Sequence, residues 1–200
     1  MALGTVIRTF AAPGASPKSV VSTGHHLWYI GNTPSAIVEL DIWTGAVIRT
    51  IATGVVFGMT FDGVDLWYIS GGVVNRFKIS TGTSIAEFAA PAASTDLCWD
   101  GDGLWVCYQN RFVGKFSRTG ALKIVHILAA GVFAGIAFDG KYLYIANDAT
   151  NVLHRISPIT GTIIDTVASP STSPRGLCWD GRALWHCDDS TDMIYQIAVN

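Results

Sequence analysis

The sequence contains little charge, and neither sign dominates. Only 14% of its 200 residues are charged, and 13 Lys and Arg against 15 Asp and Glu give a formal net charge of −2. A protein that binds nucleic acid through a basic surface needs surplus cations to neutralise phosphates. Because this chain has no such surplus, we expect no nucleic-acid partner.

Long apolar runs are missing as well. No stretch of about 18 apolar residues occurs, so we expect no membrane insertion. Met1–Leu3 precede the first recognisable strand and are too few for a signal peptide. Half of the residues are nevertheless hydrophobic, which excludes intrinsic disorder and is enough to build a core.

Cysteine is scarce and occurs in two matched segments, LCWDGDGLWVC and LCWDGRALWHC. The spacing of Cys98 from Cys107, and of Cys178 from Cys187, matches neither a CxxC zinc motif nor a redox motif. Each pair would flank a hairpin turn, and the strand register decides whether its two sulfurs share a face. We expect buried thiols that pack as small apolar groups. A structural disulfide is the first alternative and a metal site the second.

The sequence does contain a repeat of about 40 residues, the range typical of solenoids and propellers. Its clearest marker is a glycine followed by an apolar strand. The marker recurs at intervals of 41, 37, 38 and 41 residues, at Gly4, Gly45, Gly82, Gly120 and Gly161. The segment after Gly161 is about as long as one more interval, so the chain divides into five units.

Each unit contains four short segments rich in β-branched and aromatic residues, separated by Gly, Asp, Asn, Ser or Pro. No segment shows a 3.6-residue apolar period with helix caps. Four units carry an Asp-Gly pair, typical of hairpin turns, beginning at Asp62, Asp100, Asp139 and Asp180. Five units of four antiparallel strands predict an all-β fold, a five-bladed β-propeller.

The position at which the chain enters the repeat predicts how the ring closes. The last unit supplies only three strands of its own, so we expect Thr5–Phe10 to complete its blade as the outermost strand. This pairing joins the two ends of the chain and removes an exposed edge. We expect a single domain, 1–200, with blades at approximately 17–51, 56–88, 94–128, 133–167, and 174–200 together with 4–10.

The fifth unit carries the pattern GLCWDGRALW from Gly176, followed by Met193-Ile194-Tyr195. The pattern resembles the blades of NHL-, YVTN- and glutaminyl-cyclase-like propellers, and the resemblance extends over essentially the whole chain. It implies the fold more specifically than the function, since that superfamily includes enzymes, lectin-like binders and scaffolds. It also implies a secreted or cell-surface protein.

The five-bladed glutaminyl cyclases of that superfamily carry glutamates at the channel mouth and a Thr-Gln-Gly-Leu segment in a first blade. This sequence has no such segment. Its only glutamates, Glu39 and Glu87, are expected on a third and on an outermost strand, away from the axis. These departures argue against a cyclase activity.

Tryptophan recurs at one position in the second strand of the units. Exposed, these indoles would be sugar platforms of a lectin; buried, they would fill the space between blades. Burying one removes about 150–250 Å² from water, so packing is the expected role. Trp43 differs, because it lies in a turn, and it is the one we expect to be exposed. The repeated residues are Trp28, Trp67, Trp105 and Trp185, with Tyr144 in the fourth unit.

Other candidates for chemistry are weak. The acidic segment Asp188–Asp192 lacks the calcium-loop pattern, and we expect a solvated loop. No HExxH, GxSxG or P-loop motif occurs. We therefore assign no catalytic residue, no metal site and no cofactor, with a divalent ion such as calcium in the channel as the alternative.

Ligands of propellers usually lie on the face formed by the loops into the first strand and between the second and third strands. In this sequence those loops carry mixed charges that differ between blades. We expect a non-catalytic binding or scaffold module that engages a protein, a carbohydrate or a small ligand at this channel mouth. A carbohydrate-binding lectin is one alternative, and a metal-assisted cyclase, lyase or hydrolase is another. The predicted ligand-binding residues are Lys18, Asn32, Asp96, Tyr108, Gln109, Asn147, Asp148, Arg175, Asp188 and Asp192.

Overall fold

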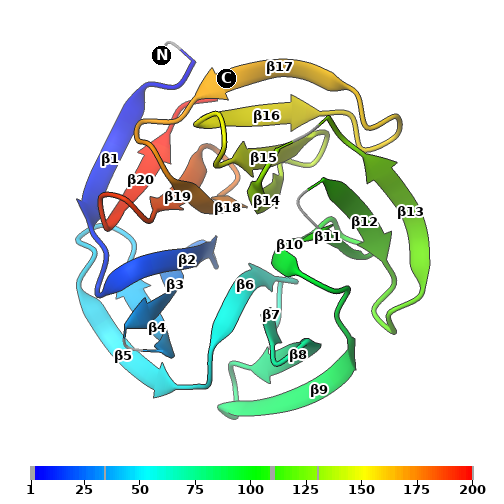
Figure 1. Ribbon diagram of the computed structural model, residues 1–200. Coiled ribbons are helices and arrows are strands. Elements are labelled where there is room, and N and C mark those ends of the chain that lie inside the picture. Colours follow the sequence, from blue (N-terminus) through cyan, green and yellow to red (C-terminus); the bar gives the residue numbers. More distant parts are fainter. Residues whose placement is uncertain (1–2, 34, 109–110, 130, 200) are drawn as a thin grey trace.

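The computed structural model describes residues 3–33, 35–108, 111–129 and 131–199. It shows five antiparallel sheets of four strands arranged in a ring (Figure 1). The prediction of an all-β, five-bladed propeller is confirmed. The described residues form no helix, and so none that could cross a bilayer.

The blades are numbered here in chain order, with their strands given from the channel outward. Blade 1 is β2 (Ala15–Ser22), β3 (His26–Thr33), β4 (Ser35–Asp41) and β5 (Val47–Ala52). Blade 2 is β6 (Val56–Phe61), β7 (Leu66–Ser70), β8 (Val73–Lys78) and β9 (Thr83–Ala89). Blade 3 is β10 (Ser94–Trp99), β11 (Leu104–Tyr108), β12 (Phe112–Phe116) and β13 (Leu122–Ile127). Blade 4 is β14 (Phe133–Phe138), β15 (Leu143–Asn147), β16 (Val152–Ile156) and β17 (Ile163–Ala168). Blade 5 is β18 (Pro174–Trp179), β19 (Leu184–Asp188), β20 (Met193–Ile197) and β1 (Val6–Ala11).

The ring closes between the two ends of the chain, as the sequence predicts. Strand β1 pairs antiparallel with β20, placing Thr9 opposite Tyr195. The Phe10 ring packs 5.8 Å from the Trp185 ring, centroid to centroid. Figure 1 shows the termini beside each other at this seam. The blade that ends the chain is therefore completed by the strand that begins it.

The repeated tryptophans are buried, which confirms their packing role. Trp28, Trp67, Trp105 and Trp185 are each at most 2% exposed. Contacts of these rings cross from blade to blade; Trp28 of blade 1 lies 6.4 Å from Phe77 of blade 2. The indoles therefore fill the gaps between sheets and are not available as sugar platforms.

All four cysteines are free and buried, as expected of thiols that pack as apolar groups. The register sets Cys98 opposite Trp105 and Asp96 opposite Cys107, so Cys98 and Cys107 form a diagonal pair. Burial raises the pKa of both thiols well above its usual value. These groups therefore stay protonated and contribute apolar packing.

Candidate functional site

The first strands of the five blades meet around the axis, and their small residues let the backbones approach closely. A Cβ added to Gly58 would lie 2.4 Å from the Cα of Asp96, and one added to Gly176 would lie 2.4 Å from the Cα of Ser19. Only glycine fits such positions. Ser19, Gly58, Asp96, Gly135 and Gly176 occupy equivalent places on these strands, so the aspartate replaces a glycine or serine of its neighbours.

Asp96 packs against Gly58, where an added Cβ would lie 2.6 Å from its Oδ1, and it is fully buried. Its carboxylate accepts hydrogen bonds from Ser19 Oγ (3.2 Å) and from the backbone N–H groups of Met59 (3.3 Å), Ile136 (3.0 Å) and Leu177 (3.4 Å). These donors belong to blades 1, 2, 4 and 5. Burial raises the pKa of Asp96 to about 8, although the hydrogen bonds from Ile136, Leu177 and Ser19 lower it. One side chain of blade 3 thus joins all five blades and closes the channel.

Above Asp96 the channel opens into a cavity of about 200 Å³, to which each blade contributes one residue. We call this cavity the mouth. Its walls differ from blade to blade, with two cations on one side and an aromatic ring on another. The lining residues are Lys18, Phe57, Thr95, Ala134 and Arg175.

The cations of the mouth are held by two aspartates in a continuous ion-pair network. Lys18 Nζ lies 3.3 Å from Asp189, and Arg175 lies 3.1 Å from Asp189 and 3.2 Å from Asp148. Burial opposes ionisation of Asp189, but Lys18 and Arg175 help to keep its pKa below the usual value. The network connects blades 1, 5 and 4 and is electrically balanced.

An apolar groove of about 400 Å³ adjoins the mouth between blades 2 and 3. Phe57 and Thr95 line both cavities, so the two are continuous. The groove adds Ile69 and the segment Ala90–Ser94, and Phe57 is 44% exposed at its edge. The face therefore combines a polar centre with an apolar side.

Asp188 lies near the mouth but is turned inward. Its carboxylate accepts hydrogen bonds from the backbone N–H groups of Ser173 (2.9 Å), Ser190 (2.9 Å) and Thr191 (3.1 Å). Burial raises its pKa, but hydrogen bonds, including those of Ser190 and Ser173, outweigh this and lower it to about 2. The expectation of a solvated loop is wrong for this residue, because its side chain is the loop's internal anchor.

Asn147 has a similar place in blade 4, where its Oδ1 accepts from the backbone of Val132 (3.3 Å) and Ala149 (3.1 Å). Tyr108 is half-buried and stacks on Phe112, with ring centroids 5.5 Å apart. Asn147 therefore holds a loop of the mouth face, whereas Tyr108 packs within blade 3.

Two predicted residues lie exposed on this face, one on a strand and one on a loop. Asn32 is at the end of β3, and Asp192 accepts a 2.9 Å hydrogen bond from the Ser16 backbone. Gln109 lies outside the described residues. Of the ten predictions, the structure thus gathers Lys18, Asp148 and Arg175 in one network around the axis and places Asp96 beneath it.

Sequence reasoning missed Asp189 and Phe57. Asp189 belongs to the acidic segment that was considered only as a calcium site. Phe57 looks like an ordinary apolar residue of a strand. An alignment of the five units would have found Phe57, because it occupies the position of Lys18 and Arg175. Asp189 had no comparable signal, since its partners come from two blades.

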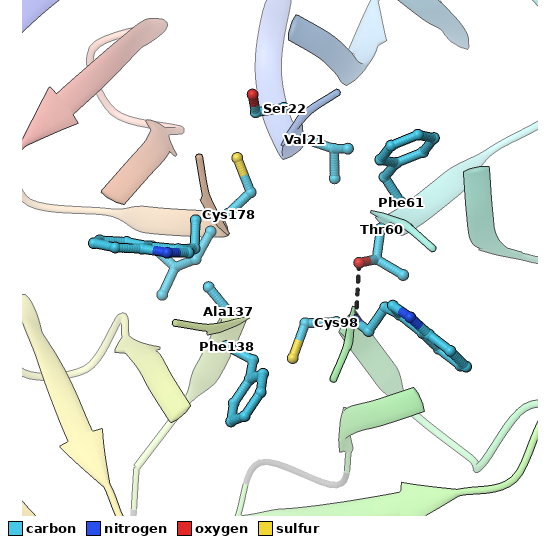
Figure 2. Close-up of a pocket in the computed structure, with 11 residues that line it drawn as sticks. Val21, Ser22, Thr60, Phe61, Cys98, Ala137, Phe138 and Cys178 are labelled. Atoms are coloured by element: carbon cyan, nitrogen blue, oxygen red, sulfur yellow. Dashed lines mark hydrogen bonds between the residues drawn. The ribbon is translucent and has the colours of Figure 1, made fainter. Parts of the chain in front are cut away.

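The opposite end of the channel is a small cavity of about 70 Å³, lined by apolar side chains, by two cysteines and by the hydroxyl-bearing residues Ser22 and Thr60 (Figure 2). Thr60 Oγ1 accepts a 3.0 Å hydrogen bond from the Trp99 backbone there, between blades 2 and 3. Cys98 and Cys178 contribute to its lining. Across the described residues, no group of three or more His, Cys, Asp or Glu side chains is arranged to hold a metal ion.

The two glutamates lie on β4 and β9, on strands away from the axis as expected. Each is paired with an arginine across its sheet, Glu39 with Arg49 and Glu87 with Arg76. Both side chains therefore hold the outer parts of their blades.

Comparison with solved structures identifies similar folds, whereas comparison of the sequence does not identify a family. No family model and no curated protein matches the sequence. Among solved structures, Myxococcus xanthus glutaminyl cyclase is 12% identical with a TM-score of 0.81, covering 98% of this chain and 95% of its own. The nidogen/laminin complex is 14% identical (TM-score 0.66; 94% and 77% covered). Virginiamycin B lyase from Staphylococcus aureus is 17% identical (TM-score 0.57; 96% and 69% covered).

These likenesses confirm the predicted resemblance to glutaminyl-cyclase-like propellers at the level of the fold. The neighbours include a cyclase, a lyase and a binding complex. Because one fold carries such different activities, the function has to be argued from the site.

Proposed function

We propose that this propeller is a non-catalytic binding module whose mouth face engages a protein partner or a small ligand. The observation that carries the proposal is that the charged groups of the mouth are committed to one another. Asp189 is held between Lys18 and Arg175, and Asp148 is held by Arg175. A general acid or base must exchange a proton with its substrate, whereas Lys18 and Arg175, against the effect of burial, help to hold the pKa of Asp189 below its usual value.

Asp96 supports the same interpretation. Its carboxylate lies below the mouth and is fully buried, and its hydrogen bonds are made to Ser19 and to the backbones of three other blades. These bonds occupy the oxygens that a substrate or a metal ion would need. The residue acts as a structural connector at the base of the cavity.

The shape of the face indicates what a ligand should look like. A polar group would meet the fixed ion-pair network at the axis, and an apolar group would enter the groove beside Phe57. Side chains that are already held in place cost little entropy to order on binding. A peptide segment with one polar and one apolar residue has this chemistry.

The proposal is tested by probing a synthetic peptide array with the wild type and with Phe57→Ser and Arg175→Gln. We expect peptides that bind the wild type to bind each variant at least tenfold more weakly. Ile159→Ser is the matched control, because Ile159 is 84% exposed and lies in the turn between β16 and β17, away from the mouth. Melting curves establish that each variant is folded.

Two outcomes would overturn the proposal. One is peptide binding that survives both mouth substitutions. The other is turnover of a peptide, lactone or glycoside substrate by the wild type that is abolished by Arg175→Gln or by Asp96→Asn.

A further inference from the structure

Trp43 is the exposed tryptophan of this protein, as the sequence predicts. Its side chain is 74% exposed, whereas the other six tryptophans are buried or half-buried. It lies in the turn between β4 and β5, at a position that the other units fill with Ser80, Arg118 and Ile159. The indole is therefore neither core packing nor a requirement of the repeat.

Trp43 borders a cavity of about 230 Å³ at the seam where blade 5 meets blade 1. We call this cavity the seam pocket. It is formed by β1, by the turn that carries Trp43 and by the Asp-Gly turn at Asp180. The Asp-Gly turns lie at the end of the blades opposite to the mouth, so the seam pocket is a separate site.

Two guanidinium groups line the seam pocket. Arg8 lies over the Trp43 ring, 4.7 Å from its centroid, and donates a 2.7 Å hydrogen bond to the Ile42 carbonyl. Arg182 is exposed on the Asp-Gly turn. Within the described part of the chain, neither arginine forms an ion pair.

The one carboxylate of the seam pocket is already occupied. Asp180 accepts hydrogen bonds from the backbone of Arg182 (2.8 Å) and Ala183 (2.7 Å), from Trp185 Nε1 (2.7 Å) and from Gln196 Nε2 (2.8 Å). It holds the turn in place and forms no ion pair with either guanidinium. With two cations against one carboxylate, the seam pocket carries a net positive charge.

At the turn equivalent to that of Trp43, the seam between blades 2 and 3 has an ion pair that the described residues of the seam between blades 5 and 1 lack. There Arg118 stands at the position of Trp43 and reaches Asp62 of the neighbouring blade at 3.0 Å. An ion pair thus joins that seam internally. At the seam of blades 5 and 1, the aromatic residue leaves the flanking arginines without such a partner.

We propose that the seam pocket binds an acidic sugar, with the ring lying against the Trp43 indole and the carboxylate bound by Arg8 and Arg182. An indole offers a flat apolar surface with a negative face, suited to the C–H face of a sugar ring. Guanidinium groups match a carboxylate in geometry as well as charge. A neutral sugar would not use the arginines, and a simple anion would not use the indole.

The test is to titrate the protein with methyl β-D-glucuronide and, as the neutral counterpart, with methyl β-D-glucoside. Calorimetry and tryptophan fluorescence measure the binding. Trp43 is the indole most open to solvent, so its emission should report occupancy. We expect saturable binding of the glucuronide and at least tenfold weaker binding of the glucoside. Trp43→Ala should weaken glucuronide binding at least tenfold, while Trp43→Phe retains most of it.

Arg182→Gln should weaken glucuronide binding at least tenfold and leave the glucoside unaffected. Ile159→Ala, at the equivalent turn position of blade 4, is the matched control and should bind normally. Phe57→Ser should also bind normally, because the mouth is a separate site; the two proposals can therefore fail independently.

Three outcomes would overturn the inference. The first is no saturable glucuronide binding at millimolar concentration. The second is unchanged binding in Trp43→Ala, and the third is equal affinity for the glucoside or for inorganic sulfate. Arg182→Gln keeps the test valid if a substitution at Trp43 disturbs folding, since Arg182 lies in an exposed turn.

Discussion

The indole Nε1 of Trp105 donates a 2.7 Å hydrogen bond to the carboxylate of Asp100, five residues earlier in the chain. The other oxygen of that carboxylate accepts from the backbone N–H groups of Asp102 (3.0 Å) and Gly103 (2.9 Å). One aspartate thus shapes the hairpin turn and satisfies the polar atom of a buried indole. The pair recurs as Trp67 with Asp62 and as Trp185 with Asp180.

Replacing Asp100 by alanine should lower the free energy of unfolding by about 2–4 kcal/mol, because a buried indole N–H and two turn N–H groups lose their acceptor. Urea denaturation measures the change. Asp102→Ala is the control, since the Asp102 side chain is 88% exposed and forms only a surface ion pair with Lys115. Equal losses in the two variants would contradict this role of Asp100.

Blade 1 lacks the aspartate, and its tryptophan shows the consequence. Thr23 stands where Asp62 stands in blade 2, and Trp28 Nε1 is buried without a hydrogen-bond partner. Thr23→Asp should therefore raise the free energy of unfolding by about 1 kcal/mol, with Thr23→Ala as the control that adds no acceptor. The Trp28 indole N–H signal in NMR should move as it gains a partner. A variant no more stable than the wild type would refute the prediction.

Asp96 should make stability fall as the pH rises. Burial raises the pKa of Asp96 from its ordinary value of 3.8 to about 8 in the folded protein, so between these values the folded state keeps a proton that the unfolded state has lost. Stability therefore decreases with pH over this range. His186 acts in the opposite direction below its unperturbed pKa of 6.5, because burial lowers its pKa to about 4 in the folded state.

The range from pH 6.5 to 8 isolates Asp96 from His186. There we expect the free energy of unfolding of the wild type to fall by roughly 2 kcal/mol, at about 1.4 kcal/mol per pH unit. Asp96→Asn cannot titrate, so its stability should be flat over this range even if it is lower throughout. Denaturant unfolding at several pH values checks the slope. An identical slope in the two proteins would show that Asp96 does not carry the effect.

Deleting residues 1–10 should destabilise the whole propeller. The deletion removes most of β1, exposes the edge of β20 and takes away the Phe10 ring that packs on Trp185. Thermal melting followed by circular dichroism should show one cooperative transition at a lower temperature. Removing residues 1–3 alone, which precede β1, should have little effect. A ten-residue truncation that melts like the full chain would contradict the closure as a source of stability.

The division of the chain into five blades could be predicted because the pattern of strands and turns repeats along the sequence. The spacing of Gly45, Gly82 and Gly120 gives the size of a blade, and the missing fourth strand of the last unit gives the closure by β1. Burial of Trp28 and its equivalents follows from their apolar character and their fixed place in each unit. The size of a blade depends on neighbours within one repeat of about forty residues. The closure by β1 joins the two ends of the chain, and it could be predicted because the repeat shows which strand the last unit lacks.

The site could be predicted only in part. The sequence predicts Lys18 and Arg175 at the channel mouth, on the loops into the first strands, and the structure places them within the strands β2 and β18 instead. The sequence gives no measure of how Arg175, Asp148 and Asp189 pair, since their separation depends on how neighbouring blades are packed. Which charged groups of the mouth pair with one another therefore depends on the closed ring.

The sequence by itself determined that the chain forms five small sheets, that its indoles are mostly buried and that its two ends meet. Only the tertiary structure decided that Asp96 closes the channel, because its hydrogen-bond donors come from four other blades and Gly58 of a neighbouring blade leaves room beside it. It also decided that Trp43 borders a pocket lined by Arg8 and Arg182. Hydrogen bonding and burial at an axis depend on the closure of the whole ring, which no single repeat contains.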